Sequence, residues 1–271
     1  MQDFSVLMSV YCKERPDYLR ASLESVFRQT VMPSEVVLVE DGPLTSELDE
    51  VVEEYEKRYK QLKVVKLPRN VGLGRALNEG LKHCSFELVA RMDTDDIAKP
   101  FRFERQLAEF RRQPDLDVCS AWMEEFSRLP EEVDAVKTLP EGNEALYEYG
   151  KRRNPVNHPV VMFRKQAVVH NGGYRHYPLF EDYYLWVRMM MSNCRFYTIP
   201  EALQAFRASR EMFLRRGGFG YALVEVRLQF LFYGMRYITF GQMLKNIAIR
   251  FIARVMPASF RARLYRRRLR S

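Results

Sequence analysis

The sequence predicts an α/β fold: a Rossmann-like half with a mixed sheet, a C-terminal half, and a basic helical tail. Short apolar segments rich in β-formers alternate with helical patterns over about the first ninety residues. Polar and acidic residues follow several of these apolar segments, and the excess positive charge lies in the last quarter of the chain. Alternating strands and helices predict βαβ units, a parallel sheet and right-handed crossovers.

The alternation is regular enough to place each element of the first half. Pro16 opens the first helical pattern, because proline is favoured in the first turn of a helix. Asp41-Gly42-Pro43 ends the second strand with a strong turn signal. Near-continuous apolar strands fit a sheet that is covered on both faces. The expected strands are Phe4–Tyr11, Glu35–Glu40, Leu62–Leu67 and Phe86–Met92, and the expected helices are Pro16–Phe27, Ser46–Tyr59 and Leu73–Leu81.

The second half of the chain gives fewer signals. The polar segment Ser127–Tyr149 has no clear period. A boundary near Ala208–Gly218 divides an expected catalytic domain, residues 1–208, from a basic region, residues 209–271. We expect helices over Phe101–Arg112 and Tyr183–Met191, a strand around Val118–Met123 and an extended segment over Pro155–Phe163.

Composition and charge limit the class of protein. Hydrophobic residues make up 47% of the 271 positions, which excludes a largely disordered chain. The four cysteines lack zinc or disulfide spacing and favour a reducing cytosol. No secretory signal is visible, and no apolar run reaches the roughly 18–20 residues that a membrane span needs. Residues 210–271 hold 14 Lys and Arg and two acids, which predicts an anionic partner surface.

Three carboxylates follow the fourth expected strand within four residues, at Asp93, Asp95 and Asp96. Like charges this close repel each other unless a cation neutralises them. Carboxylate oxygens suit Mg²⁺ or Mn²⁺, and such an ion on a diphosphate offsets the charge of a leaving phosphate. The alternative is a solvated acidic turn in which one aspartate caps the next helix. Three acids are more than a cap requires, so the sequence predicts a metal site.

Two positions near the other strand ends have both a functional and a structural interpretation. Asp41 either binds a base or ribose or begins a turn. Gly72-Leu73-Gly74-Arg75 begins like a dinucleotide fingerprint, but Leu77 occupies the place of the third glycine. The segment is therefore either a tight loop that presents Arg75 to a phosphate or a plain helix start.

Acidic and histidine side chains in the second half are candidates for acceptor chemistry. Glu181 and Asp182 precede a helical pattern, where the helix dipole alone favours acids. The functional alternative is a general base that takes the proton of an acceptor hydroxyl. His158 stands alone in the sequence, and a lone histidine is more often structural than catalytic.

The order and spacing of these motifs resemble the family 2 glycosyltransferases with the GT-A fold. The resemblance is greatest to amylovoran-type bacterial enzymes of exopolysaccharide, capsule and O-antigen synthesis, and it covers about residues 4–205. Glu40 stands where an aspartate is usual, and Pro43 where a serine is common. The motifs that carry it are Val10-Tyr11, Glu40-Asp41-Gly42, Asn70-x-Gly72-x-x-Arg75-x-x-Asn78-x-Gly80, Met92-Asp-x-Asp-Asp96, His158, Gly172-Gly173-Tyr174 and Glu181-Asp182-Tyr183-x-Leu185-Trp186-x-Arg188.

The resemblance implies a role for each matched residue in an inverting, single-displacement transfer. Asp182 is the implied catalytic base with Glu181 beside it, and His158 belongs to the acceptor site. Asp93, Asp95 and Asp96 are the implied ligands of Mn²⁺ or Mg²⁺. The donor-binding residues implied are Ser9, Val10, Tyr11, Glu14, Asp41, Asn70, Gly72, Arg75, Asp93, Thr94 and Asp95.

The resemblance also implies partners and a location. The donor is expected to be a UDP-sugar, and the acceptor a polyprenyl-diphosphate-linked saccharide at the inner face of a bacterial plasma membrane. In Leu244–Val255 the apolar residues share one helical face, with Arg250 and Arg254 on the opposite side, and Arg261–Arg270 is rich in arginine. Both segments predict attachment to an anionic membrane surface rather than to nucleic acid. The alternative is that the apolar face packs on the catalytic domain while the arginines are solvated, and the apolar segment Tyr221–Phe240 favours such packing.

Three other functions are open to the sequence alone. A sugar nucleotidyltransferase also uses metal-binding acids, but Val10–Arg15 lacks the glycine- and arginine-rich loop that a triphosphate needs. A non-enzymatic basic module for membrane or nucleic acid explains the tail but not the acids at the strand ends. The incomplete fingerprint disfavours an NAD(P) oxidoreductase.

Overall fold

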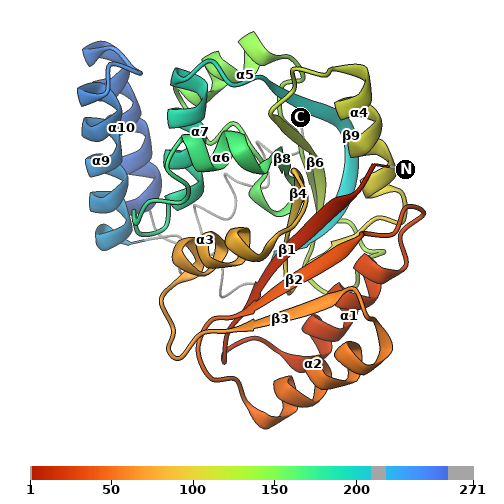
Figure 1. The fold of residues 1–271 in the computed structure, drawn as a ribbon. Helices are drawn as coiled ribbons and strands as arrows, with labels where there is room; N and C mark the ends of the chain where they lie inside the picture. The colour runs from red at the N-terminus through yellow and green to blue at the C-terminus, as the bar shows by residue number, and fades with distance from the viewer. Residues whose placement is uncertain (1, 209–217, 256–271) are drawn as a thin grey trace.

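The computed structural model describes residues 2–208 and 218–255, which are drawn in Figure 1. All seven elements expected in the first ninety residues are present, with ends that lie within about two residues of the expected ones. They are β1 (Phe4–Val10), α1 (Pro16–Phe27), β2 (Glu35–Glu40), α2 (Ser46–Arg58), β3 (Leu62–Lys66), α3 (Leu73–His83) and β4 (Leu88–Asp93).

The second half of the fold departs from the expectation in two places. The segment Pro155–Phe163 is not extended throughout, because a 3-10 turn, η1 (His158–Val160), interrupts it at Pro159. The sequence also gave no indication of the twelve-residue strand β9 (Phe196–Arg207), which contains Pro200. The other elements are β5 (Ile97–Ala98), α4 (Arg102–Arg112), β6 (Val118–Phe126), β7 (Ala135–Lys137), α5 (Asn143–Gly150), β8 (Met162–Arg164), α6 (Lys165–His170), α7 (Glu181–Met191), α9 (Phe219–Gly234) and α10 (Phe240–Val255).

The described strands form one mixed nine-stranded sheet in the order β3-β2-β1-β4-β8-β6-β9-β5, with β7 beside β6. Strands β3, β2, β1 and β4 run parallel and form the Rossmann-like half. Strand β8 runs antiparallel to β4 and β6 and joins the two halves. The mixed α/β architecture predicted from the sequence is therefore confirmed.

Helices cover both faces of the sheet, as the apolar strands predict. On β1, Phe4, Val6 and Met8 belong to a core that α1, α2 and α4 complete. The alternate residue Leu7 points to a second core formed with α3, α7 and α9. Figure 1 shows α9 and α10 side by side at the margin of the molecule, beyond α7.

The described part of the basic region is the helical hairpin of α9 and α10. Helix α9 buries Leu228 and Phe232 in the second core, as expected for its apolar sequence. In the described part of the chain, no helix is long and apolar enough to cross a membrane. The expected boundary falls on residues 209–217, and Arg261–Arg270 also lies outside the described residues.

Candidate active site

The ends of three parallel strands bring the first candidate residues together. In the register of the sheet, Ser9 of β1 lies beside Asp93 of β4, and Val10 lies beside Glu40 of β2. The Val10 side chain is fully buried, so only its backbone is available at this edge. Tyr11 follows and is half-buried. This edge is the carboxyl end of the parallel strands, where open α/β sheets bind ligands.

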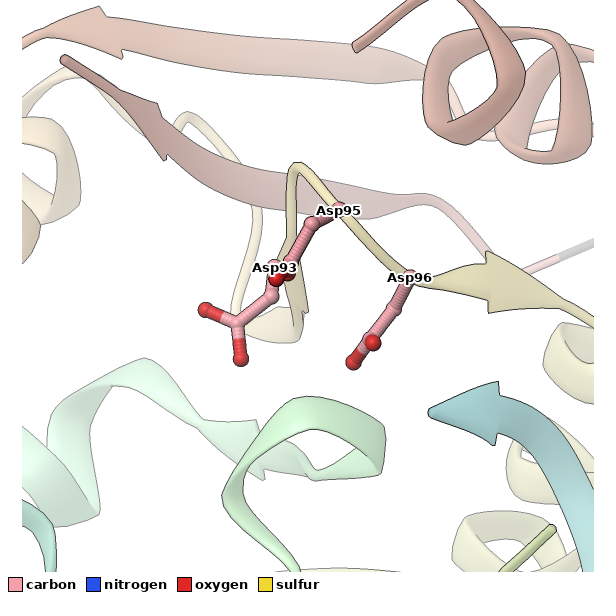
Figure 2. A group of neighbouring side chains, drawn as sticks. All are labelled: Asp93, Asp95 and Asp96. Atoms are coloured by element: carbon pink, nitrogen blue, oxygen red, sulfur yellow. The ribbon is translucent and has the colours of Figure 1, made fainter. Parts of the chain in front are cut away.

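The aspartates Asp93, Asp95 and Asp96 leave one turn between β4 and β5. Figure 2 shows the three side chains on this turn, with the Asp95 carboxylate directed toward Asp93. One oxygen from each residue lies within 4.8 Å of an oxygen of the others. The predicted cluster is therefore formed in space as well as in sequence.

Arg91 neutralises one of these carboxylates. Its guanidinium donates hydrogen bonds to both oxygens of Asp93, over 2.7 Å to Oδ2. The Arg91 side chain is 1% exposed, and the neighbouring Asp93 charge raises its pKa against the effect of burial. Arg91 is not among the residues predicted from the sequence, although an arginine inside the apolar strand LVARMD is itself a sign of a buried partner.

Asp96 ties the cluster to β9. Its Oδ2 accepts a hydrogen bond from Gln204 Nε2 and its Oδ1 one from the Arg207 backbone N–H, each over 2.8 Å. Gln204 in turn accepts from the guanidinium of Arg102, which is completely buried. Burial and the neighbouring Asp95 charge raise the pKa of Asp96. Gln204, Arg207 and Arg102 also escaped prediction, because β9 itself was not expected.

Asp95 lies among other acids of the cluster. Its carboxylate accepts a hydrogen bond from its own backbone N–H. Burial, followed by the charges of Asp93 and Glu14, raises its pKa to about 7. Glu14 lies close by and accepts a hydrogen bond from Thr94 Oγ1 over 2.9 Å, and burial raises the pKa of Glu14 as well. The negative charge of these acids exceeds the positive charge of the groups that face them. A divalent cation would neutralise the excess.

Asp41 shapes the loop that precedes α3. Its carboxylate accepts the backbone N–H groups of Val71 over 2.7 Å and Gly72 over 3.1 Å. Gly42 is needed beside it, because its φ is +88° and a Cβ there would lie 2.6 Å from the Asn70 nitrogen. Asp41 is 4% exposed, whereas Asn70 is exposed and Gly72 half-buried. Asp41 therefore has a structural role in this loop, and its expected contact with the nucleoside stays a prediction.

The glycine-rich start of α3 brings the helix close to the expected base. A Cβ on Gly74 would lie 3.1 Å from Cγ of Glu181 and 3.3 Å from Cβ of Tyr174. Gly74 therefore allows α3 and α7 to approach each other, which explains a glycine here without a dinucleotide. Arg75 in the same turn is exposed.

The expected base has a hydrogen-bonding partner that the sequence did not reveal. Asn154 Nδ2 donates to Asp182 Oδ2 over 2.6 Å. Burial raises the pKa of Asp182, against the smaller lowering effects of the Tyr183 backbone N–H and of Asn154. Glu181 beside it is half-buried, and burial raises its pKa too. A carboxylate with a raised pKa is a better proton acceptor.

His158 lies on the same side of the fold. Its Nε2 is 2.9 Å from the hydroxyl of Tyr174, and burial, with a smaller effect of Arg91, lowers its pKa well below the usual range. Tyr174 is fixed by Asn78, which donates to the Tyr174 carbonyl over 2.7 Å and accepts from its N–H over 2.8 Å. A neutral histidine in this place can donate or accept a hydrogen bond but carries no charge.

Comparisons with known proteins identify the family of this chain. Residues 5–173 match the model of the family described as Glycosyl transferase family 2. An Escherichia coli protein described as UDP-Gal:alpha-D-GlcNAc-diphosphoundecaprenol beta-1,3-galactosyltransferase is 40% identical over 267 residues, which cover 98% of this chain and 96% of that protein. The amylovoran biosynthesis glycosyltransferase AmsE of Erwinia amylovora is 38% identical over 262 residues, with 97% of each chain covered.

Solved structures confirm the fold. Staphylococcus aureus TarS matches with a TM-score of 0.63 at 22% identity; the match covers 93% of this chain and 43% of that one, so the chain spans less than half of TarS. A shorter form of TarS, residues 1–349 in complex with UDP, matches with a TM-score of 0.59 at 20% identity, covering 96% of this chain and 68% of that one. The fold is thus of the GT-A type, and the chain belongs to glycosyl transferase family 2 and is a glycosyltransferase.

Proposed function

We propose that this glycosyltransferase moves a sugar from a UDP-sugar to a hydroxyl of a lipid-diphosphate-linked saccharide, with inversion at the anomeric carbon. The observation that carries the proposal is the combination of an acidic, metal-suited strand end with the half-buried carboxylate of Asp182 at the start of α7. Burial raises the pKa of Tyr174, and the charges of both Asp182 and Asp93 add to this effect, so Tyr174 is near both carboxylates. Arg91 pairs with Asp93 and also lowers the pKa of Asp182.

The residues at the end of β4 fit a divalent cation. They offer oxygen ligands, and their charge is only partly neutralised by Arg91. Asp95 is the ligand we favour most, because both oxygens of Asp93 accept from Arg91 and both oxygens of Asp96 accept from β9, whereas Asp95 accepts from its own backbone N–H. Mn²⁺ or Mg²⁺ held here with the donor diphosphate would offset the negative charge of the leaving group.

The chain's own residues account for the rest of the reaction. Asp182 accepts the proton of the acceptor hydroxyl while the oxygen of that hydroxyl attacks the anomeric carbon. The bond from that carbon to the diphosphate breaks, and the UDP oxygen keeps the electron pair. Asn154 donates a hydrogen bond to Oδ2 of Asp182 and so orients the carboxylate. We assign the donor side to Ser9–Tyr11, Glu14, Asp41, Asn70, Gly72, Arg75 and Asp93–Asp95, and the acceptor side to His158.

The relatives support the choice of substrates. The E. coli relative is named for a UDP-sugar donor and a diphosphoundecaprenol-linked acceptor, and the alignment covers nearly all of both chains. An acceptor of that class lies in a membrane, so we extend the proposal to peripheral attachment at the cytoplasmic face. The domain division at residues 208 and 209 and the attraction of Arg261–Arg270 to anionic lipid belong to this proposal.

A thermal-shift panel of nucleotide sugars tests the donor. A ligand that binds only the folded protein raises its melting temperature by mass action. We expect a UDP-sugar to raise it with Mn²⁺ or Mg²⁺ present, and less with EDTA. Transfer to a polyprenyl-diphosphate-linked saccharide should then release UDP and give the inverted anomer by NMR. Release of pyrophosphate, or a product with the donor's configuration, would overturn the proposal.

A further inference from the structure

The hairpin of α9 and α10 pairs three of its charged side chains, Glu225, Arg250 and Arg254, across the two helices. Glu225 of α9 is 1% exposed and forms ion pairs with Arg250 and, over 2.9 Å, with Arg254 of α10. Gln229 of α9 accepts a hydrogen bond from Asn246 of α10 over 2.8 Å, and both side chains are buried. The arginines that the sequence placed opposite the apolar face of α10 thus face the protein.

The outward surface of the hairpin is apolar instead. On α9 the large exposed side chains recur at helical spacing, so that Phe219, Leu223, Phe230 and Tyr233 share one face. On α10, Phe240, Leu244 and Ile252 are 50–61% exposed and also share a face. We call these residues, together with Ile249, the outer face; they are Phe219, Leu223, Phe230, Tyr233, Phe240, Leu244, Ile249 and Ile252.

Two aromatic pairs join the two helices across this face. The rings of Phe219 and Phe251 lie 6.0 Å apart, and those of Tyr233 and Phe240 lie 5.8 Å apart. These pairs stand near opposite ends of the hairpin, so aromatic side chains join the two helices at both ends. A helix of a water-soluble protein places its apolar side toward the core and its charges outward. The hairpin buries Leu228 and Phe232 in the core, but it also leaves the large apolar side chains of the outer face exposed, which is the pattern of a surface that meets an apolar partner.

The charges around the outer face select a lipid partner. Residues 218–255 contain a single acid, Glu225, which is buried. The cations Arg227, Arg236 and Lys245 are exposed, and the chain after α10 adds six arginines and no acid in residues 256–271. An apolar surface bordered by cations complements the interface of an anionic bilayer.

We propose that the outer face of the α9–α10 hairpin inserts into the headgroup and acyl-chain boundary of an anionic membrane. The preference for lipid over a protein partner rests on the proposed function, because a lipid-linked acceptor lies in the same bilayer. The hairpin lies in the plane of the membrane, as its helices are too short and polar to cross it. Insertion adds an apolar contribution to the free energy of membrane binding. Salt does not screen this contribution, whereas it does screen the attraction of Arg261–Arg270 to anionic lipid.

Flotation with vesicles of phosphatidylcholine and phosphatidylglycerol tests the proposal. The double variant Phe230→Glu/Leu244→Glu should bind at least about ten-fold more weakly than the parent at high salt, where the apolar contribution dominates. The matched control Leu129→Glu changes a side chain that is 56% exposed on the loop after β6, and it should bind like the parent. Unchanged binding of the double variant would overturn the proposal, as would a loss of self-association without a loss of vesicle binding.

A fluorescent variant locates the face directly. Phe230→Trp should be quenched by lipids with brominated acyl chains, whereas Leu129→Trp should not. Equal quenching of the two would contradict insertion. The UDP-induced thermal shift and transfer to a soluble acceptor analogue should be unaffected in all variants. If the parent protein itself lacks those activities, the proposed function is wrong. The vesicle-binding result still tests membrane insertion independently.

Discussion

Asn154 Nδ2 donates a hydrogen bond of 2.6 Å to Oδ2 of Asp182. The bond joins the loop after α5 to the first turn of α7, 28 positions apart in the sequence. It stabilises the charged form of Asp182, whereas burial, the larger effect, disfavours that form and raises the pKa. The structure therefore sets both the direction and the basicity of the carboxylate that we propose as the base.

The first prediction concerns that base. Asp182→Asn should lower kcat by about 10²–10⁴-fold, the usual contribution of general acid–base catalysis. The affinity for UDP should be unchanged in isothermal titration, because a base for the acceptor need not contact the donor. A variant that lost UDP binding but turned over bound donor at the normal rate would contradict the assignment.

The second prediction is a pH dependence that separates Asn154 from the base. The base works only when deprotonated, so kcat should fall as the pH falls through the raised pKa of Asp182. Asn154→Ala removes a hydrogen bond that lowers this pKa, so the acidic limb of the kcat profile should move to higher pH. Asn143→Ala is a suitable control, since its side chain accepts the Phe196 N–H away from Asp182. An unmoved limb in Asn154→Ala would limit Asn154 to a structural role.

The third prediction contrasts two neighbours in the acidic cluster. Asp93→Asn leaves the buried Arg91 without its counter-charge and should destabilise the protein by about 3 kcal/mol. Asp95→Asn removes a charge that Asp93 and Glu14 repel. It should raise the melting temperature of the metal-free protein by about 2–4 °C, the shift that about 1 kcal/mol produces in a protein of this size.

Metal titration completes this contrast. Asp95→Asn should abolish the stabilisation by Mn²⁺ and with it the transfer activity, although the apo protein is more stable. Stability is measured by calorimetry with and without Mn²⁺. Full EDTA-sensitive activity of Asp95→Asn would remove Asp95 from the proposed metal site.

The fourth prediction uses two glycines of α3. Gly74→Ala places a Cβ 3.1 Å from Glu181 Cγ and should shift the start of α7 by a few tenths of an ångström. We expect kcat to fall by about ten-fold with little change in stability, because catalysis depends steeply on position. Gly80→Ala clashes instead with Leu7 and Val39 in the core, and should lower stability by about 1–3 kcal/mol while kcat below the melting temperature is normal. Equal kinetic effects of the two would contradict the role of Gly74.

The elements that could be predicted are those whose local pattern and final environment agree. Strand β1 is apolar, short and buried on both faces, and the acids Asp93–Asp96 directly follow the equally apolar β4. Strand β9 was missed because Pro200 and Glu201 interrupt its apolar pattern, and its long pairing with β6 decides its conformation. The contacts of Asn154 and Gln204 could not be predicted for a related reason. Asn154 is 28 positions from its partner Asp182, and Gln204 is 108 positions from its partner Asp96.

The tail shows what helical periodicity leaves open. The sequence predicts the apolar side chains of α10 on one helical face and Arg250 and Arg254 on the other; in the structure Leu244 and Ile252 are exposed, whereas Ile247 packs on the second core. Periodicity does not say which face meets the protein, and here Glu225 decides it, because a buried acid attracts both arginines. Glu225 is the single acid of the two helices, which is the signal that could have found the pairing.

The last prediction tests this inward network. Glu225→Gln keeps the shape of the side chain but leaves Arg250 and Arg254 beside each other without a counter-charge. Removing one partner of a buried ion pair costs about 3–5 kcal/mol, and the two arginines here are 14–16% exposed, so we expect about 3 kcal/mol. Because Arg250 also donates to the Arg152 carbonyl, the loss should loosen the hairpin from the catalytic half.

Urea denaturation of Glu225→Gln should then show an early transition, and proteases should cut first in α9 or α10. The control Arg227→Gln changes an exposed side chain and should alter the free energy of unfolding by less than about 0.5 kcal/mol. Since the ion pairs are shielded from solvent, the effect should persist at high salt. A single transition at the parent's midpoint would show that the pairing of Glu225 with Arg250 and Arg254 does not hold the hairpin together.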